Sequence, residues 1–231
     1  MHSFQYYVPT EIVFGAGSED RAAELVKKYG GSRVLIVCGG GSAVRSGLVG
    51  RVAAALDAAG VAHELFQGVQ PNPRLSYARE GVKKALAMDA DLILAIGGGS
   101  AIDTAKAVAH GRANPDADIW EFWSGRPLEK TTPVGVILTL PASGSESSNS
   151  AVLTNEELGL KKGLSTDLNR PAFAILDPRL AATLPKFQAA CGVTDIMPPM
   201  LVCFRRYASI SASLPRRSTG RRSGSILMKA I

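Results

Sequence analysis

Two runs of three consecutive glycines carry the residues best suited to chemistry in this chain. Residues 39–41 lie in VLIVCGGGSAVRSG, and residues 97–99 lie in LAIGGGSAIDTAKAVA. Because glycine has no Cβ, it lets the backbone approach a ligand closely. The start of a helix presents free N–H groups and the positive end of its dipole. A strand followed by three glycines and a helix therefore predicts an anion site, most often one for a phosphate.

Tight turns are the other interpretation of these glycines, but two such junctions in one chain favour a phosphate-bearing cofactor. The dinucleotide fingerprint GxGxxG is not matched, because Val44 and Ile102 occupy its last position. No GK[ST] follows either run, which excludes a P-loop. Ser42 and Ser100 are expected to cap the helices that follow.

The rest of the chain must position these loops, and its pattern alternates between strand and helix. Apolar runs predict buried strands at 34–38, 61–66, 92–96, 134–138 and 172–176. Helical spacing predicts helices at 48–59, 75–86 and 101–110. Two short strands, 151–154 and 162–164, flank a turn. The alternation predicts an α/β fold with a parallel sheet covered on both faces.

Composition narrows the class of protein. The 231 residues are 46% apolar and carry a net charge of +6. All 20 acidic residues lie at or before Asp195, whereas residues 196–231 carry seven basic residues and no acid. The positive charge therefore belongs to the tail, which lacks the interleaved aromatic residues of a nucleic-acid surface. Cys38, Cys191 and Cys203 lie far apart, and no signal or membrane segment is visible, so a cytoplasmic location is expected.

Two acidic residues leave alternatives open. Asp103 and Lys106, three residues apart on a predicted helix, fit either a surface ion pair or a place near the cofactor. Asp195 has no second ligand at i+4, where Pro199 stands, so spacing alone favours an ordinary surface acid. The three histidines form no ligand pattern.

Five motifs in order resemble the iron-containing alcohol dehydrogenases, and most closely their butanol dehydrogenase branch. They are PTEIVFGAGS, QPNPR, IGGGSAIDTAKAVA, TLPASGSESS and AILDPRLAATLPKFQAACGVTDIM. The resemblance spans residues 4–197. It implies a Rossmann-like parallel-sheet domain of the dehydroquinate synthase-like fold and an all-helical C-terminal domain. It also implies a metal-dependent interconversion of alcohols and aldehydes.

The resemblance assigns cofactor residues one by one. Gly97, Gly98, Gly99 and Ser100 match the pyrophosphate loop, and Asp103 matches the acid near the nicotinamide, where it counts as catalytic. The adenosine side is matched by Asn72, Thr139, Leu140, Ser143, Ser145 and Lys161. Relatives that use NAD tend to carry an aspartate at the position of Gly39. Here Gly39, Gly40, Gly41 and Ser42 leave room for a 2′-phosphate that Arg45 could bind, so NADP(H) is the expected cofactor.

Asp195 matches the first ligand of the family's Fe²⁺ or Zn²⁺, and through that metal it would be catalytic. Pro199 stands where the resemblance places a histidine, and the other two metal-binding histidines have no counterpart. We expect a nucleotide domain at 1–180, the start of a helical domain at 181–197, and an aberrant, disordered tail at 198–231, as in a truncated or frameshifted gene. A broken helix at Pro198 and Pro199 is part of this expectation.

The function expected by resemblance is that of a dehydrogenase of primary alcohols, inactive in this form. The alternative is a non-catalytic NADP(H)-binding module. The expected partners are a small alcohol or aldehyde and a second copy of the chain, with no nucleic acid and no membrane.

Overall fold

The computed structural model describes residues 7–213 and divides the chain into two units, Met1–Pro185 and Lys186–Ile231. The boundary lies five residues after the predicted end of the first domain at residue 180. Leu180, the last residue of the predicted domain, packs against the core of the first unit. No helix among the described residues is long and apolar enough to cross a membrane.

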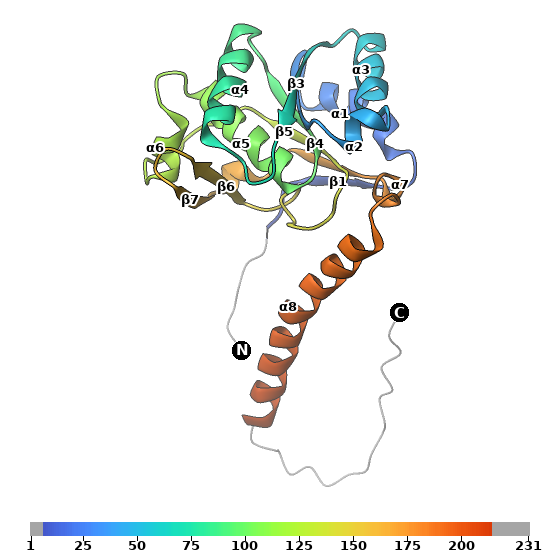
Figure 1. Ribbon diagram of the computed structural model, residues 1–231, viewed down its shortest axis with the longest axis vertical. Helices are drawn as coiled ribbons and strands as arrows, with labels where there is room; N and C mark the ends of the chain where they lie inside the picture. Colours follow the sequence, from blue (N-terminus) through green and yellow to red (C-terminus); the bar gives the residue numbers. More distant parts are fainter. Residues whose placement is uncertain (1–6, 214–231) are drawn as a thin grey trace. The chain divides into compact units, whose positions relative to one another are not determined.

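The first unit is built on a six-stranded sheet in which every paired strand is parallel (Figure 1). The spatial order is β1-β8-β5-β4-β2-β3. The strands are β1 (Glu11–Phe14), β2 (Arg33–Gly39), β3 (Ala62–Val69), β4 (Leu92–Gly97), β5 (Val134–Leu138) and β8 (Phe173–Leu176). This arrangement confirms the predicted α/β class.

Helices cover both faces of this sheet, as Figure 1 shows. On one face Val34 and Ile36 of β2 pack with α1 (Ala22–Lys28) and α3 (Leu48–Ala58). On the other face Leu35 and Val37 pack with α4 (Leu75–Ala87) and α5 (Gly99–Ala113). Successive side chains of a strand point to opposite faces, so a strand buried on both sides is apolar throughout.

The order of the strands places a topological switch between β2 and β4. The chain passes from β2 outward to β3, and then returns to β4 on the other side of β2. In open parallel sheets, ligands bind at the carboxyl ends of the strands at such a point. Both triple-glycine runs follow the two strands that flank it, because β2 ends at Gly39 and β4 ends at Gly97.

A two-stranded antiparallel hairpin lies outside the main sheet. It consists of β6 (Ser150–Asn155) and β7 (Leu160–Ser165), which confirms the predicted pair of short strands. Ala151 and Leu153 of β6 are buried with residues of α4, α5 and α6 (Ile119–Trp123). The hairpin therefore lies on the helical face that α4 and α5 form. Four short elements complete the unit: η1 (Ser18–Arg21), α2 (Ser42–Arg45), η2 (Asp167–Asn169) and α7 (Pro178–Ala181).

The second unit corrects the expected helix break. Helix α8 runs from Lys186 to Ser213 and passes through Pro198 and Pro199. The two prolines remove two backbone hydrogen bonds and crowd the preceding turn, but their φ is compatible with a helix, and α8 continues through them at an energetic cost. The expected break is therefore wrong, whereas the expected disorder of the tail stays a prediction, and its last part, 214–231, lies outside the described residues.

The expected caps at Ser42 and Ser100 are also wrong. Helix α2 begins at Ser42 and α5 at Gly99, so both serines lie within the first turn of their helices. The N-cap residues are Gly41 and Gly98, and neither helix has a side-chain cap. A glycine cap leaves the first N–H groups of the helix for another acceptor.

Candidate functional site

Three loops meet at the carboxyl ends of the adjacent strands β5, β4 and β2. They enclose a cavity of about 630 Å³. Eleven of the predicted cofactor residues line it: Gly39, Gly40, Gly41, Ser42, Arg45, Gly97, Gly98, Gly99, Ser100, Thr139 and Leu140. The sheet thus brings together residues that are up to a hundred positions apart in the sequence.

The second glycine run is needed for its close packing against the loop that follows β5. A Cβ added to Gly98 would lie 3.2 Å from the Cβ of Leu140. A Cβ added to Gly99 would overlap the side chain of Ser143. Because Leu140 and the glycines share the wall of the cavity, any larger side chain here would displace that wall.

The first backbone N–H groups of α5 have no acceptor within the helix, as at the start of any α-helix. The first backbone donors that bond to a carbonyl are those of Ala101 and Ile102, at 3.0 and 3.2 Å from the oxygen of Gly98. The N–H groups of Gly99 and Ser100 precede them at the positive end of the helix dipole. This arrangement can bind a phosphate through the backbone alone.

A Cβ would fit at each glycine of the first run, whereas at the second run it would crowd its neighbours. A Cβ added to Gly39 would have the carbonyl oxygen of Val69 as its nearest neighbour, at 3.6 Å, which is ordinary contact. The guanidinium group of Arg45 lies 3.9 Å from the Cβ position of Gly41. Near the end of β2, Arg45 therefore lines the cavity, and residues 39–42 supply no carboxylate to it.

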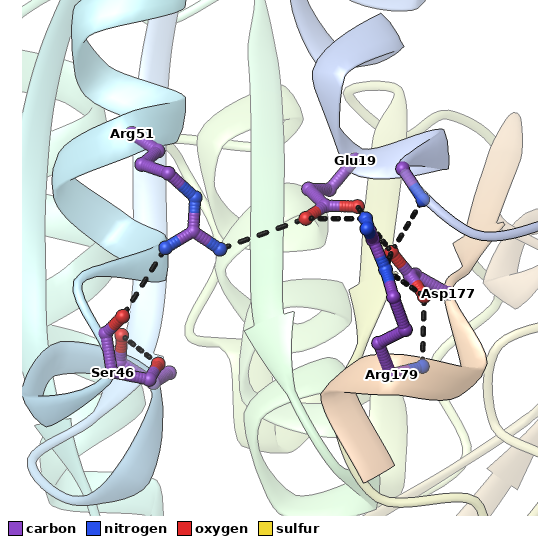
Figure 2. A network of polar contacts seen from close by, with 7 residues as sticks. Glu19, Ser46, Arg51, Asp177 and Arg179 are labelled. Atoms are coloured by element: carbon purple, nitrogen blue, oxygen red, sulfur yellow. Dashed lines mark hydrogen bonds and ion pairs between the residues drawn. The ribbon is translucent and has the colours of Figure 1, made fainter. Parts of the chain in front are cut away.

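A second cavity of about 750 Å³ shares Ser42, Arg45 and Thr139 with the first. Arg51, Glu19 and Arg179 line it as well, and Figure 2 shows how they connect. Arg51 donates to the carbonyl of Ser46 at 3.2 Å and lies 3.6 Å from the Glu19 carboxyl group. Arg179 approaches that group to 3.4 Å. No pattern in the sequence predicted this network of Glu19, Arg51 and Arg179.

Asp177 anchors the far end of the network. Its carboxylate accepts from Arg179 at 2.7 Å and from the backbone N–H of Gly17 at 2.7 Å. The hydrogen bonds from Arg179 hold the pKa of Asp177 far below its ordinary value, whereas burial raises the pKa of Glu19. The network thereby ties α3 and the end of α2 to α7, across the rim of the cavities (Figure 2).

Five predicted cofactor residues do not line the first cavity. Two of them meet each other, because the Lys161 ammonium group donates to Asn72 Oδ1 at 2.8 Å. Asp103 accepts from the hydroxyl of Ser145 at 2.5 Å and from the backbone N–H of Val152 at 3.0 Å. One carboxylate oxygen is thus engaged by the loop before β6 and the other by β6 itself, and the place of Asp103 near a nicotinamide stays a prediction. Ser143 packs behind Gly99.

Lys106 is not part of a surface ion pair. Its side chain is fully buried. Burial lowers its pKa to about 8, although the nearby Asp103 acts in the opposite direction. Residues on every side of α5 are buried, so the helix has no solvated face for a lysine.

The described residues do not fit a metal centre. Asp195 is exposed on α8, and within residues 7–213 no group of three or more His, Cys, Asp or Glu side chains could hold an ion. Metal sites of catalytic type use three or more protein ligands. The described residues therefore do not supply enough ligands for a catalytic metal ion.

Comparisons with known proteins identify the family. The model of the iron-containing alcohol dehydrogenases matches residues 9–178. NADH-dependent butanol dehydrogenase A of Clostridium acetobutylicum is 44% identical over 198 residues, which are 85% of this chain and 50% of that protein. NADPH-dependent aldehyde reductase YqhD of Escherichia coli is 36% identical and covers 84% of this chain and 50% of its own.

Solved structures agree with these relatives. The crystal structure of NADH-dependent butanol dehydrogenase A from Thermotoga maritima superposes with a TM-score of 0.80 at 39% identity, over 84% of this chain and 49% of that one. The chain thus spans about half the length of the relatives it matches. It belongs to the iron-containing alcohol dehydrogenase family.

Proposed function

We propose that residues 9–185 bind NADP(H) and serve the interconversion of primary alcohols and aldehydes in the whole protein. The observation that carries this proposal is the cavity at the topological switch, lined by both glycine loops. A phosphate-bearing dinucleotide suits a site whose walls are backbone N–H groups and glycines. The family membership supports the reaction class.

In this proposal each loop has a separate task. Gly97, Gly98, Gly99 and Ser100 hold the pyrophosphate through the backbone at the start of α5. The loop from Gly39 to Ser42 receives the adenosine ribose. Arg45 pairs with the 2′-phosphate, which no carboxylate at position 39 repels. This chain is similar to one relative named as NADH-dependent and to another named as NADPH-dependent. The proposed preference for NADP(H) therefore rests on Gly39 and Arg45.

The nicotinamide would supply the hydride that is exchanged with the carbonyl carbon. The residues described here bind and orient the nucleotide. A divalent metal, Fe²⁺ or Zn²⁺, belongs to the whole protein in this proposal, with Asp195 as one ligand. Since residues 7–213 offer no set of three ligands, we propose that they bind the nucleotide without turnover.

Titration of the purified chain with NADPH and NADH, followed by nicotinamide fluorescence, tests the binding. We expect tighter binding of NADPH. The variant Gly99→Val should lose binding of both nucleotides, because its side chain overlaps Ser143 at the cavity wall. Ala58→Val adds similar bulk at an exposed position at the end of α3 and should bind normally. Equal binding by the wild-type chain and Gly99→Val, with both folded, would refute the site.

A turnover assay tests whether this chain can catalyse the reaction. We expect no oxidation of NADPH by butanal in the presence of Fe²⁺ or Zn²⁺. This result, together with binding, is also what a non-catalytic nucleotide-binding module would give. Metal-dependent turnover that Asp195→Ala abolishes would instead show that this chain carries ligands beyond those described.

We further propose a homodimer and a cytoplasmic location, both by family resemblance. The edge strand β1 exposes Ile12 and Phe14, whose side chains would be covered in an assembly. Sedimentation equilibrium of the wild-type chain and of Phe14→Ser measures this directly. A monomer at all concentrations would contradict the dimer.

A further inference from the structure

Lys106 lies at the centre of a buried polar cluster for which the proposed function has no role. Its side chain is among the largest of those that are fully buried in the described part of the chain. The ammonium group donates to the carbonyl oxygens of Ser145 at 2.8 Å, Ser150 at 2.9 Å and Ser148 at 3.2 Å. It also contacts the hydroxyl of Ser145 at 2.9 Å. Four oxygens from one six-residue segment thus surround a single cation.

The segment 145–150 takes several hydrogen bonds from side chains, in addition to backbone bonds such as that from the Thr166 N–H to the Asn149 carbonyl at 2.9 Å. The hydroxyl of Ser145 donates to Asp103, one turn before Lys106 on α5. The carbonyl of Asn149 accepts from the side chain of Asn169 at 3.0 Å, and that of Ser147 accepts from Arg170 at 2.8 Å. A loop without regular structure must pair its buried carbonyls in this way, and an unpaired group costs about 1–3 kcal/mol.

The same loop forms a wall of the nucleotide cavity. It connects β5 to β6, and its first half contains Leu140 and Ser143, which pack against Gly98 and Gly99. Ser143 is only two residues from Ser145. The cation therefore fixes the second half of the loop directly behind the half that contacts the glycines.

We propose that Lys106 is a positioning residue for nucleotide binding, an internal cation around which segment 145–150 folds so that Leu140 and Ser143 hold their places against the glycine loop. This inference rests on the proposed function, because it assigns Lys106 to the same cavity. Lys106 itself does not line that cavity and acts only through the loop.

The protonation state of Lys106 gives this role a recognisable signature. With a pKa lowered to about 8 by burial, the ammonium group has three N–H donors at pH 7 and two after it loses its proton. Asp103 and Glu146 favour the charged form, and Arg170 opposes it. His110, one turn further along α5, has a pKa lowered to about 4 and does not titrate between pH 7 and pH 9.

The test uses Lys106→Met in the full chain, with Lys27→Met as the control. Lys27 is exposed on α1, so its replacement removes a charge without disturbing the loop. For Lys106→Met we expect at least tenfold weaker binding of NADPH, and faster amide hydrogen exchange confined to the peptide that contains residues 143–152. Lys27→Met should match the wild-type chain in both.

A pH profile separates positioning from a general loss of stability. The affinity of the wild-type chain for NADPH should fall between pH 7 and pH 9, and that of Lys106→Met should not. If Lys106→Met fails to fold, Ser145→Ala and the wild-type pH profile provide the test. A folded Lys106→Met that binds NADPH as tightly as the wild-type chain would overturn the inference, as would a flat wild-type profile. If the wild-type chain binds neither nucleotide, the proposed function itself fails.

Discussion

Introducing a carboxylate at position 39 should reverse the nucleotide preference. In Gly39→Asp the new Cβ lies 3.6 Å from the carbonyl oxygen of Val69, which is an ordinary contact, so the Cβ displaces no neighbour. Gly39 has no positive φ that would strain an aspartate. The fold should therefore tolerate the change, and any effect on binding comes from the added charge.

The magnitude follows from Coulomb's law. A carboxylate about 6 Å from a phosphate charge is repelled by about 0.7 kcal/mol in bulk water, and by about 3 kcal/mol at the effective dielectric constant near a protein surface. Since about 1.4 kcal/mol is a factor of ten in affinity, NADPH should bind about 3-fold to 100-fold more weakly. NADH should bind more tightly, because the carboxylate can accept a hydrogen bond from the ribose 2′-hydroxyl group.

Fluorescence titration of Gly39→Asp with both nucleotides at low and high salt measures the effect. Salt should reduce the loss of NADPH affinity, because ions screen exposed charges. Ala58→Asp is the control, since it adds the same charge at an exposed position at the end of α3, next to the start of β3. The reasoning is refuted if Gly39→Asp keeps the wild-type ratio of affinities, or if Ala58→Asp changes the ratio equally.

Three further predictions concern stability. Gly135→Ala should lower the free energy of unfolding by about 1–3 kcal/mol, measured by urea denaturation, because its Cβ would overlap the buried ring of Phe173. Burial lowers the pKa of His110 to about 4, so the unfolded chain binds the proton first. Stability should fall by up to about 3 kcal/mol as the pH drops from about 6.5 to 4, and His110→Gln should flatten that fall. Asp177→Asn should cost about 1–3 kcal/mol by weakening the bond to Gly17. Because the folded pKa of Asp177 is depressed, its contribution is present above the ordinary aspartate pKa and is lost in acid, so Asp177→Asn should lose less stability below pH 4 than the wild-type chain.

Strongly apolar segments were predictable from sequence, and short or half-buried ones were not. The strand at 134–138 matches β5 residue for residue, because all five side chains are buried. β1 was missed, since only Val13 of its four residues is buried, as befits an edge strand. α6 was also missed, although Asp118 accepts from the N–H of Trp120 as an N-cap. That cap ahead of an apolar aromatic run is a signal that could have found the helix.

The part of the candidate site that backbone forms was predictable from the sequence, and the contacts between its side chains were not. Glycine runs after apolar strands located the cavity, because the topology of a parallel sheet carries such loops to one edge. The spacing of Asp103 and Lys106 left open a surface ion pair or a place near the cofactor, and the burial of Lys106 excludes the surface pair. Asp103, Lys106 and His110 recur at the spacing of a solvated helix face, and only the tertiary packing of Ser150, Val152 and Asn169 against them buries that face.

The buried Lys106 connects the core of the fold to the candidate nucleotide site through one helix, α5. The N-terminus of α5 faces the cavity, and the middle of the same helix holds the loop that closes the cavity wall. An apolar residue in place of Lys106 would suit the core but would leave carbonyls of the loop without donors. A lysine, with three donors on a long apolar stem, crosses the core and still pairs with the backbone beyond it. The affinity for the nucleotide should therefore respond to this cluster more strongly than to substitutions of equal cost elsewhere in the core.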